Sequence, residues 1–391
     1  MQLEICDTFD RNEAKMNEAS EGKSTFRILL LADASSIHTE KWIRGLAGSG
    51  PVELHLVTMN PAGVRAGLRD VAALTGIEEF YAGPVQEGGG NWRYLLNVPR
   101  VAGAIRRMQP DVVVAIYLTS YGLVGALAKG NAVMVHVMIG SDVMITPGKH
   151  WLHERLSRYA LARGDLYVSS SNAMTGRLRE LVDVPEDVIV TQQYGVEDWV
   201  MDHPVLPKTY GFVSNRAWVA NSNIPLLLRI FGRLRSPGTL ALIGSGGPVE
   251  AQIRREAAGD SRIAALGALE YRQNIEVIAR SGFYFSMTAS DGASLSLMEA
   301  MALGAIPVVS DIEPNREWIG QGVNGVLVPL ADESVAAQRI ETLLAQPRDQ
   351  LDAMRERNRA IIRDRGSLTR NMARFRERLC TVIARRRERP S

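Results

Sequence analysis

The chain of 391 residues has little cysteine and no long apolar run. Only Cys6 and Cys380 occur, so cysteines alone cannot build a zinc cluster, and this usage fits a reducing compartment. Nowhere do about eighteen apolar residues follow one another, which speaks against a transmembrane helix. Residues 7–23 are polar and lack the apolar core of a secretory signal. We therefore expect a cytoplasmic protein.

Motifs of several enzyme classes are also missing. The sequence contains neither the HExxH motif of zinc proteases nor the GxSxG turn that carries a nucleophilic serine. The formal net charge is only +2, which gives no reason to expect a nucleic-acid partner. With 46% hydrophobic and 23% charged residues, the composition is that of a globular protein.

The pattern of apolar segments indicates strands alternating with helices. Residues 1–25 look like a disordered extension and stand outside this pattern. In the first half of the chain, strands are expected at 27–34, 52–58, 111–117, 133–138 and 166–170, and helices at 39–47, 98–108, 151–163 and 173–181. Such alternation is typical of a doubly wound parallel sheet, whose strands read as continuous apolar runs.

A proline-marked stretch at 203–207 interrupts the pattern, which then restarts. Strands are expected at 210–214, 240–243, 263–266, 283–287 and 306–310, and helices at 224–234, 249–258, 272–280, 294–303 and 334–345. We therefore predict α/β domains at residues 26–205 and 209–370, followed by a basic helix or tail at 371–391. Ligands of such sheets bind beyond the carboxyl ends of the strands, so two such faces can oppose each other across a cleft.

The most informative segment is SDGASLSLMEAMALG at residues 290–304, which follows a predicted strand and opens a helix. Its small residues Gly292, Ala293 and Ser294 allow a ligand to approach the free amides of the first helical turn, which attract phosphate. Glu299 lies among apolar residues and needs a partner, for which a pair of sugar hydroxyls is suited. An alternative stays open, in which Asp291 caps the helix and Glu299 is a satisfied buried acid.

This segment resembles the signature of the retaining glycosyltransferases of family 4, which have the GT-B fold of two Rossmann-like doubly wound domains facing a central cleft. The signature has two acids separated by seven residues, here Asp291 and Glu299, and continues as EAMALGAIPVVSD. The first acid is normally glutamate, so the shorter aspartate draws the carboxylate back and can change the sugar that is accepted. The resemblance implies an N-terminal acceptor-side domain and a C-terminal domain that binds a nucleotide-sugar.

The resemblance also assigns roles to residues of the segment. Glu299 would hold the ribose of the nucleotide, and Asp291 would face the transferred sugar. The backbone around Gly292 and Ala293 would lie close to the donor. The amides at Ser294, Leu295 and Ser296 would hold the diphosphate.

Two further stretches of the second domain agree with the family. Arg216 lies where the family has a phosphate-binding arginine, and its planar fork could clamp a diphosphate; the alternative is a surface ion pair. The family's lysine a few residues later is missing, and Asn221 is among the residues found there instead. Gly246, in the glycine turn after the strand at 240–243, would lie near the nucleotide, although a tight turn without a ligand is an equal alternative.

In the first domain, Asp142 follows the strand at 133–138 and resembles the acid of a turn that lines the acceptor side of the family's cleft. Ile139 replaces the family's histidine in this turn. A purely structural role for Asp142 is an equal alternative. His38 follows the first strand and could contact acceptor or donor phosphate, unless it is a helix cap or a surface residue.

The C-terminal residues 371–391 contain seven arginines against two glutamates, with apolar residues at helical spacing. We expect the first part of this helix to pack on the protein. The alternative is peripheral contact with an anionic membrane, to which each arginine could contribute about 1 kcal/mol.

These features together predict a hexosyltransferase-like enzyme that moves a sugar from a nucleoside-diphosphate sugar to a glycan or lipid-linked acceptor. Retention of configuration and a place in cell-envelope or exopolysaccharide synthesis follow from the resemblance alone. No Asp-x-Asp pair occurs, so we expect a metal-independent reaction without a bound cofactor. The alternatives are a nucleotide-sugar epimerase and a catalytically impaired sugar-nucleotide-binding protein.

Overall fold

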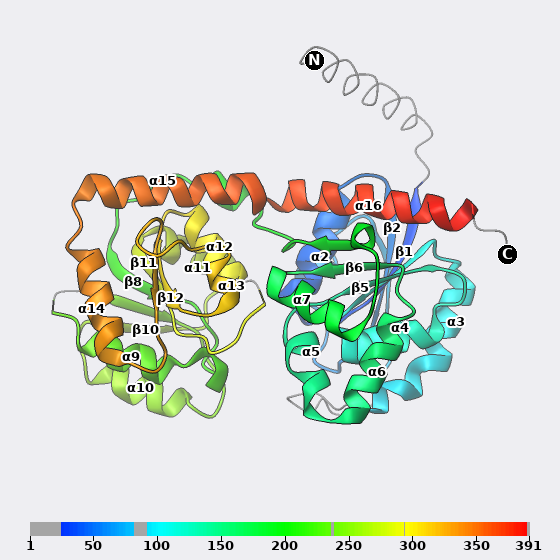
Figure 1. Cartoon of the computed structure of the whole chain (residues 1–391), viewed down its shortest axis with the longest axis horizontal. Coiled ribbons are helices and arrows are strands. Elements are labelled where there is room, and N and C mark those ends of the chain that lie inside the picture. Colours follow the sequence, from blue (N-terminus) through cyan, green and yellow to red (C-terminus); the bar gives the residue numbers. More distant parts are fainter. Residues whose placement is uncertain (1–24, 82–91, 236–237, 293, 389–391) are drawn as a thin grey trace, which may run out of the picture.

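The computed structural model describes residues 25–81, 92–235, 238–292 and 294–388. Two α/β units lie side by side, and helices α15 (Arg348–Arg365) and α16 (Leu368–Glu388) run along one side of both (Figure 1). The prediction of two doubly wound α/β domains is confirmed.

The first unit contains a seven-stranded parallel sheet in the order β3-β2-β1-β4-β5-β6-β7. Its strands are β1 (Phe26–Leu31), β2 (Val52–Thr58), β3 (Leu74–Glu79), β4 (Val112–Ile116), β5 (Val133–Val137), β6 (Leu166–Ser169) and β7 (Ile189–Thr191). Its helices include α2 (Ile37–Gly48), α3 (Val98–Met108), α4 (Leu123–Ala128), α5 (Ser141–Met144), α6 (Trp151–Leu161) and α7 (Asn172–Leu181). β4 and β5 are buried along their whole length because helices cover both faces of the sheet.

The second unit contains a six-stranded parallel sheet in the order β10-β9-β8-β11-β12-β13. Its strands are β8 (Tyr210–Ser214), β9 (Leu240–Ile243), β10 (Ile263–Gly267), β11 (Ser281–Ser286), β12 (Ile306–Ser310) and β13 (Val326–Val328). Its helices include α9 (Ile224–Gly232), α10 (Glu250–Ala258), α11 (Tyr271–Ala279), α12 (Leu295–Ala302) and α14 (Glu333–Leu344). The strand order reverses beside β1 in the first sheet and beside β8 in the second, and such switch points create ligand-binding crevices.

The C-terminal helix α16 packs on the first unit along its whole length. Its apolar face is buried in the core of that unit through Met372, Phe375, Leu379, Val382 and Ile383. The ring of Phe375 lies edge-on to that of Trp42 in α2, with 5.2 Å between the ring centroids. This face is therefore covered by protein, which corrects the expectation that only the first part of the helix packs.

The arginines at the end of α16 pair with acids of the first unit. Arg386 lies 2.7 Å from Asp165, and Arg385 pairs with Asp187. The apolar face of α16 is therefore buried in the protein, and Arg385 and Arg386 are paired with its acids. Neither feature faces a membrane. Among the described helices, none is long and apolar enough to cross a bilayer.

Candidate functional site

A cavity of about 250 Å³ lies between the two units, beyond the carboxyl ends of strands of both sheets. The first unit contributes residues that follow β1 and β5, and the second unit contributes residues that follow β8 and β11. The predicted site residues that line it are His38, Arg216, Asp291, Ser294, Leu295 and Ser296. Residues from distant parts of the sequence thus meet at one cleft, as the switch points of the sheets predict.

Helix α12 begins at this cavity. Ser294 is its N-cap, and the Ser294 hydroxyl accepts a hydrogen bond from the amide of Leu297 at 3.3 Å. The amides of Leu295 and Ser296 belong to the first turn, where no carbonyl of the helix itself can reach them. These donors and the positive end of the helix dipole make the cavity wall suited to a phosphate group. The cap is Ser294, so the alternative in which Asp291 caps the helix is wrong.

Arg216 and Asp291 form an ion pair at the same wall, with 3.0 Å between Nη2 and Oδ2. Arg216 also donates a hydrogen bond to the Ser294 hydroxyl at 3.0 Å. Both side chains are mostly buried, so Arg216 does not form the exposed surface pair that was its alternative. The guanidinium therefore lies between the helix start and the acid that was expected to face the sugar.

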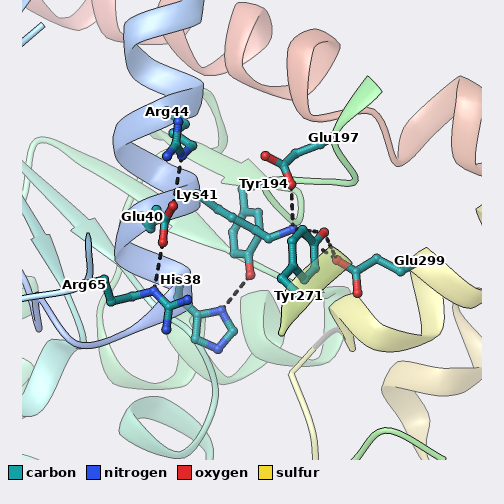
Figure 2. Close-up of polar contacts among 9 residues, drawn as sticks. All are labelled: His38, Glu40, Lys41, Arg44, Arg65, Tyr194, Glu197, Tyr271 and Glu299. Atoms are coloured by element: carbon teal, nitrogen blue, oxygen red, sulfur yellow. Dashed lines mark hydrogen bonds and ion pairs between the residues drawn. The ribbon is translucent and has the colours of Figure 1, made fainter. Parts of the chain in front are cut away.

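His38 reaches the cavity from α2. Its Nδ1 atom lies 2.6 Å from the hydroxyl of Tyr194 (Figure 2). Burial lowers the pKa of His38, and the charges of Lys41 and Arg216 act in the same direction, while Asp291 opposes them. The N-cap of α2 is Ser36, so His38 is not a helix cap. A neutral imidazole therefore faces the cleft near neutral pH.

Glu299 lies at the centre of a buried cluster that joins the two units. Lys41 of α2 donates to Glu299 Oε1 at 3.0 Å and to Glu197 Oε2 at 3.3 Å (Figure 2). The hydroxyl of Tyr271 donates to the same Oε1 atom at 2.6 Å, and Lys41 donates to that hydroxyl at 2.6 Å. Burial and the nearby carboxylates raise the pKa of Tyr271, so it remains a hydrogen-bond donor.

Glu299 therefore has protein partners, as expected under the alternative in which it is a satisfied buried acid. The sequence reasoning missed Lys41 and Tyr271 altogether. A lysine beside the apolar Trp42 and Ile43 was the available signal, because a charge on the buried face of a helix requires a partner. The partner itself is 258 positions away in the sequence and could not be identified without the fold.

Asp142 does not face the cavity. It is fully buried, and its carboxylate accepts hydrogen bonds from the amides of Leu118 at 2.8 Å, Gly140 at 2.9 Å and Ile139 at 3.3 Å. Burial raises its pKa, and these backbone hydrogen bonds act against the rise. The expectation of an acid touching substrate is corrected: Asp142 positions the turn after β5, and Ile139 of that turn lines the cavity.

The two units touch where Gly292 meets this turn. A Cβ atom on Gly292 would lie 2.9 Å from the carbonyl oxygen of Ile139 and 2.8 Å from Oγ of Ser170. Only a residue without a side chain allows this approach, which is the physical reason for a small residue here. Ala293 lies outside the described residues.

Asn221 and Gly246 border the site without lining the cavity. The side chain of Asn221 donates to the carbonyl of Ser290 at 2.8 Å and accepts from the amide of Ser290 at 3.1 Å. Asn221 thus holds the loop before Asp291 and is a positioning residue. Gly246 is exposed and its amide donates to Glu250 at 2.5 Å, so the glycine turn has a local partner. Within the described ranges, no group of three or more His, Cys, Asp or Glu side chains could hold a metal ion.

Two family models match consecutive parts of the chain. Residues 27–171 match the model described as "Glycosyl transferase 4-like", and residues 207–346 match "Glycosyl transferases group 1". A mannosyltransferase of Komagataeibacter xylinus that uses GDP-mannose and cellobiosyl-diphosphopolyprenol is 30% identical over 82 residues. That match spans only 21% of either chain.

Solved structures share the fold across nearly the whole chain. Anabaena HepE in complex with UDP and glucose has a TM-score of 0.70 at 15% identity, covering 91% of this chain and 100% of HepE. Sucrose-phosphate synthase of Thermosynechococcus elongatus has a TM-score of 0.72 at 15% identity, covering 92% of this chain and 100% of that protein. With the two models matching one domain each, the chain belongs to the glycosyltransferases with the GT-B fold.

Proposed function

We propose that the chain transfers a hexosyl group from a nucleoside-diphosphate sugar to a glycan or lipid-linked acceptor. The observation that carries the proposal is the start of α12, which opens into the interdomain cavity beside Arg216. The diphosphate of the donor binds the amides of Leu295 and Ser296, and Arg216 clamps it from the side. These donors stabilise the charge that develops on the diphosphate as it departs.

The nucleoside binds next to Glu299. Both side-chain hydrogen bonds that Glu299 accepts from Lys41 and Tyr271 fall on Oε1. Oε2 is therefore the atom that accepts from the ribose hydroxyls, while the ammonium group of Lys41 keeps the buried carboxylate ionised.

Asp291 faces the transferred sugar at the cavity. Its pairing with Arg216 supports a role in orienting the sugar rather than in attacking it, because a carboxylate held by a guanidinium is a poor nucleophile. Catalysis then rests on positioning and on stabilisation of the leaving group, without a metal ion. We propose retention of configuration on the strength of the family resemblance.

The acceptor enters from the side of the first unit. The printed name of the Komagataeibacter relative includes a lipid-linked glycan, which supports an acceptor of that kind and a place in cell-envelope or exopolysaccharide synthesis. Such an acceptor would bring the protein to the inner face of the membrane.

A thermal-shift panel of UDP-, GDP- and ADP-sugars tests the donor site, because a ligand that binds only the folded state raises the melting temperature. We expect one base to stabilise the protein and Glu299→Ala to abolish the shift. Glu356→Ala, at an exposed acid of α15, is the matched control. If no nucleotide sugar shifts the melting temperature, the proposed donor site is wrong.

Radiolabelled donor and a cell-envelope extract then test turnover. A labelled product that requires the extract supports a transferase. A product formed without acceptor would instead identify an epimerase, and binding without any product would identify a sugar-nucleotide-binding protein.

A further inference from the structure

A second cavity, of about 280 Å³, lies in the first unit. Its wall is formed by the 3-10 helix Trp92–Asn97, the turn after β4, and α6. Most of the wall is apolar and includes Trp92, Leu95, Leu123 and Leu156. A cavity with this mostly apolar lining is suited to part of an apolar chain.

Two polar atoms in this apolar wall lack a partner among the described residues. Ser157 is only 2% exposed, and its Oγ atom has no hydrogen bond. Nδ1 of His153, one turn earlier on α6, is also buried without a partner. Burying such groups unpaired is costly, so this wall is suited to a ligand that accepts hydrogen bonds there. A ligand with oxygen atoms next to an apolar chain would pair the two polar atoms and also cover the apolar wall.

The surface next to the cavity carries two exposed aromatic rings. Trp92 is 68% exposed, and Trp151 at the start of α6 is 66% exposed. Exposed aromatic rings of this kind are typical of surfaces that contact lipid. Residues 149–163 contain four lysines and arginines against one acid, Glu154, which gives this segment a net positive charge, and none of the four lines the cavity itself.

The second cavity adjoins the acceptor side of the interdomain cleft. Asp142 connects the two, because it binds the amide of Leu118, next to the cavity residue Thr119, and also binds the amide of Ile139, which lines the cleft. A glycan joined to a ligand in this cavity can therefore extend toward the donor sugar. Asp142 thus fixes the wall of the second cavity relative to the wall of the cleft.

We infer that this cavity binds the isoprenoid diphosphate end of a lipid-linked acceptor, an inference that rests on the proposed function. The first part of the isoprenoid chain packs on Leu95, Leu123 and Leu156. The phosphate oxygens accept hydrogen bonds from Ser157 and from His153, and the remaining chain leaves over the exposed rings of Trp92 and Trp151.

Calorimetric titration of the full chain with farnesyl diphosphate tests this site, with farnesol and inorganic diphosphate as the two half-ligands. We expect farnesyl diphosphate to bind about tenfold or more tightly than either half, since both ends contribute. Leu156→Trp, which fills the cavity, should abolish binding, whereas Leu127→Ala, at an exposed leucine of α4 outside the lining, should not. Thermal melts check that each variant is folded.

Ser157→Ala removes only the hydroxyl and is the second variant. It should weaken farnesyl diphosphate severalfold and leave farnesol unchanged, whereas a merely structural serine would affect both alike. A saturating nucleotide should not compete, since competition would place farnesyl diphosphate in the donor cleft and overturn the inference. Unchanged binding by folded Leu156→Trp would overturn it as well. If nucleotide sugars bind and farnesyl diphosphate does not, this site is wrong while the proposed donor site stands.

Discussion

The ammonium nitrogen of Lys41 lies 3.0 Å from Oε1 of Glu299, and this buried contact joins the two domains. Lys41 also reaches Glu197 of the segment before the interdomain connection, so one cation pairs with two acids. Because Lys41 is 2% exposed, its charge has almost no contact with water. The two domains are thus held together beside the proposed ribose site by a buried ion pair with one partner from each domain.

Replacement of Lys41 by methionine should destabilise the protein strongly. Removing one partner of a buried ion pair leaves an uncompensated charge and typically costs about 3–5 kcal/mol. Denaturant unfolding measures the loss, and Lys41→Met combined with Glu299→Gln should recover part of it. Arg44→Ala, which breaks a pair that is partly exposed, should cost only about 0–1 kcal/mol. Equal losses of unfolding free energy in Lys41→Met and Arg44→Ala would contradict a stabilising role for the buried pair of Lys41 and Glu299.

Arg216→Ala should lower kcat by about 10²–10³-fold, as expected for loss of one preorganised group that stabilises the leaving charge. Steady-state kinetics with the donor found in the thermal-shift panel measures the effect. Arg316→Ala removes an arginine that pairs with Asp311 on the surface, and it should retain full activity. Normal kcat in Arg216→Ala would remove Arg216 from the proposed mechanism.

Gly292→Ala should prevent close contact between the domains, because the new Cβ would meet the backbone oxygen of Ile139. A misplacement of the donor loop by about 1 Å can cost about 10²-fold in rate. We expect that loss in kcat/KM together with a larger radius of gyration in X-ray scattering. Gly176→Ala, where a Cβ meets nothing within 4 Å, is the control and should change neither quantity.

Stability should fall as the pH drops below the ordinary pKa of histidine, because burial lowers the pKa of His136 from 6.5 to about 4. Between these two values the unfolded chain binds a proton at this site and the folded protein does not. The free energy of unfolding should therefore decrease by about 3 kcal/mol from pH 7 to pH 4 through this residue. Denaturant unfolding of His136→Phe should show a shallower dependence on pH.

Local patterns were sufficient to predict most of both sheets. β2, β8, β9 and β12 have the expected bounds. β9 and β12 are buried along their whole length, and strands buried on both faces are apolar runs that a sequence shows directly. The expected helix at 294–303 also agrees closely with α12, since the apolar run after Ser294 is a local signal. By contrast, β3, β7 and β13 escaped prediction; they are short or lie at sheet edges, where that apolar signal is weak.

The last part of the chain shows where local patterns fail. The expected final helix was at 334–345, but α15 follows it with 18 residues, most of them charged or polar. Its helical state depends on contact with α12 and β12 rather than on a broad apolar face. The return of α16 to the first unit depends on the core around Trp42 and Phe375, which does not exist until that unit has folded.

The order of residues along the chain accounts for the two α/β domains and for the start of α12 at Ser294, because both arise from neighbouring residues. The partners of Glu299, the burial of Asp142 and the second cavity depend on segments that are far apart in sequence. The sequence alone does not predict which distant side chain will pair with a buried charge. Packing of the two domains against each other brought Lys41 to Glu299 and buried that acid, whereas Asp291 lines the cavity.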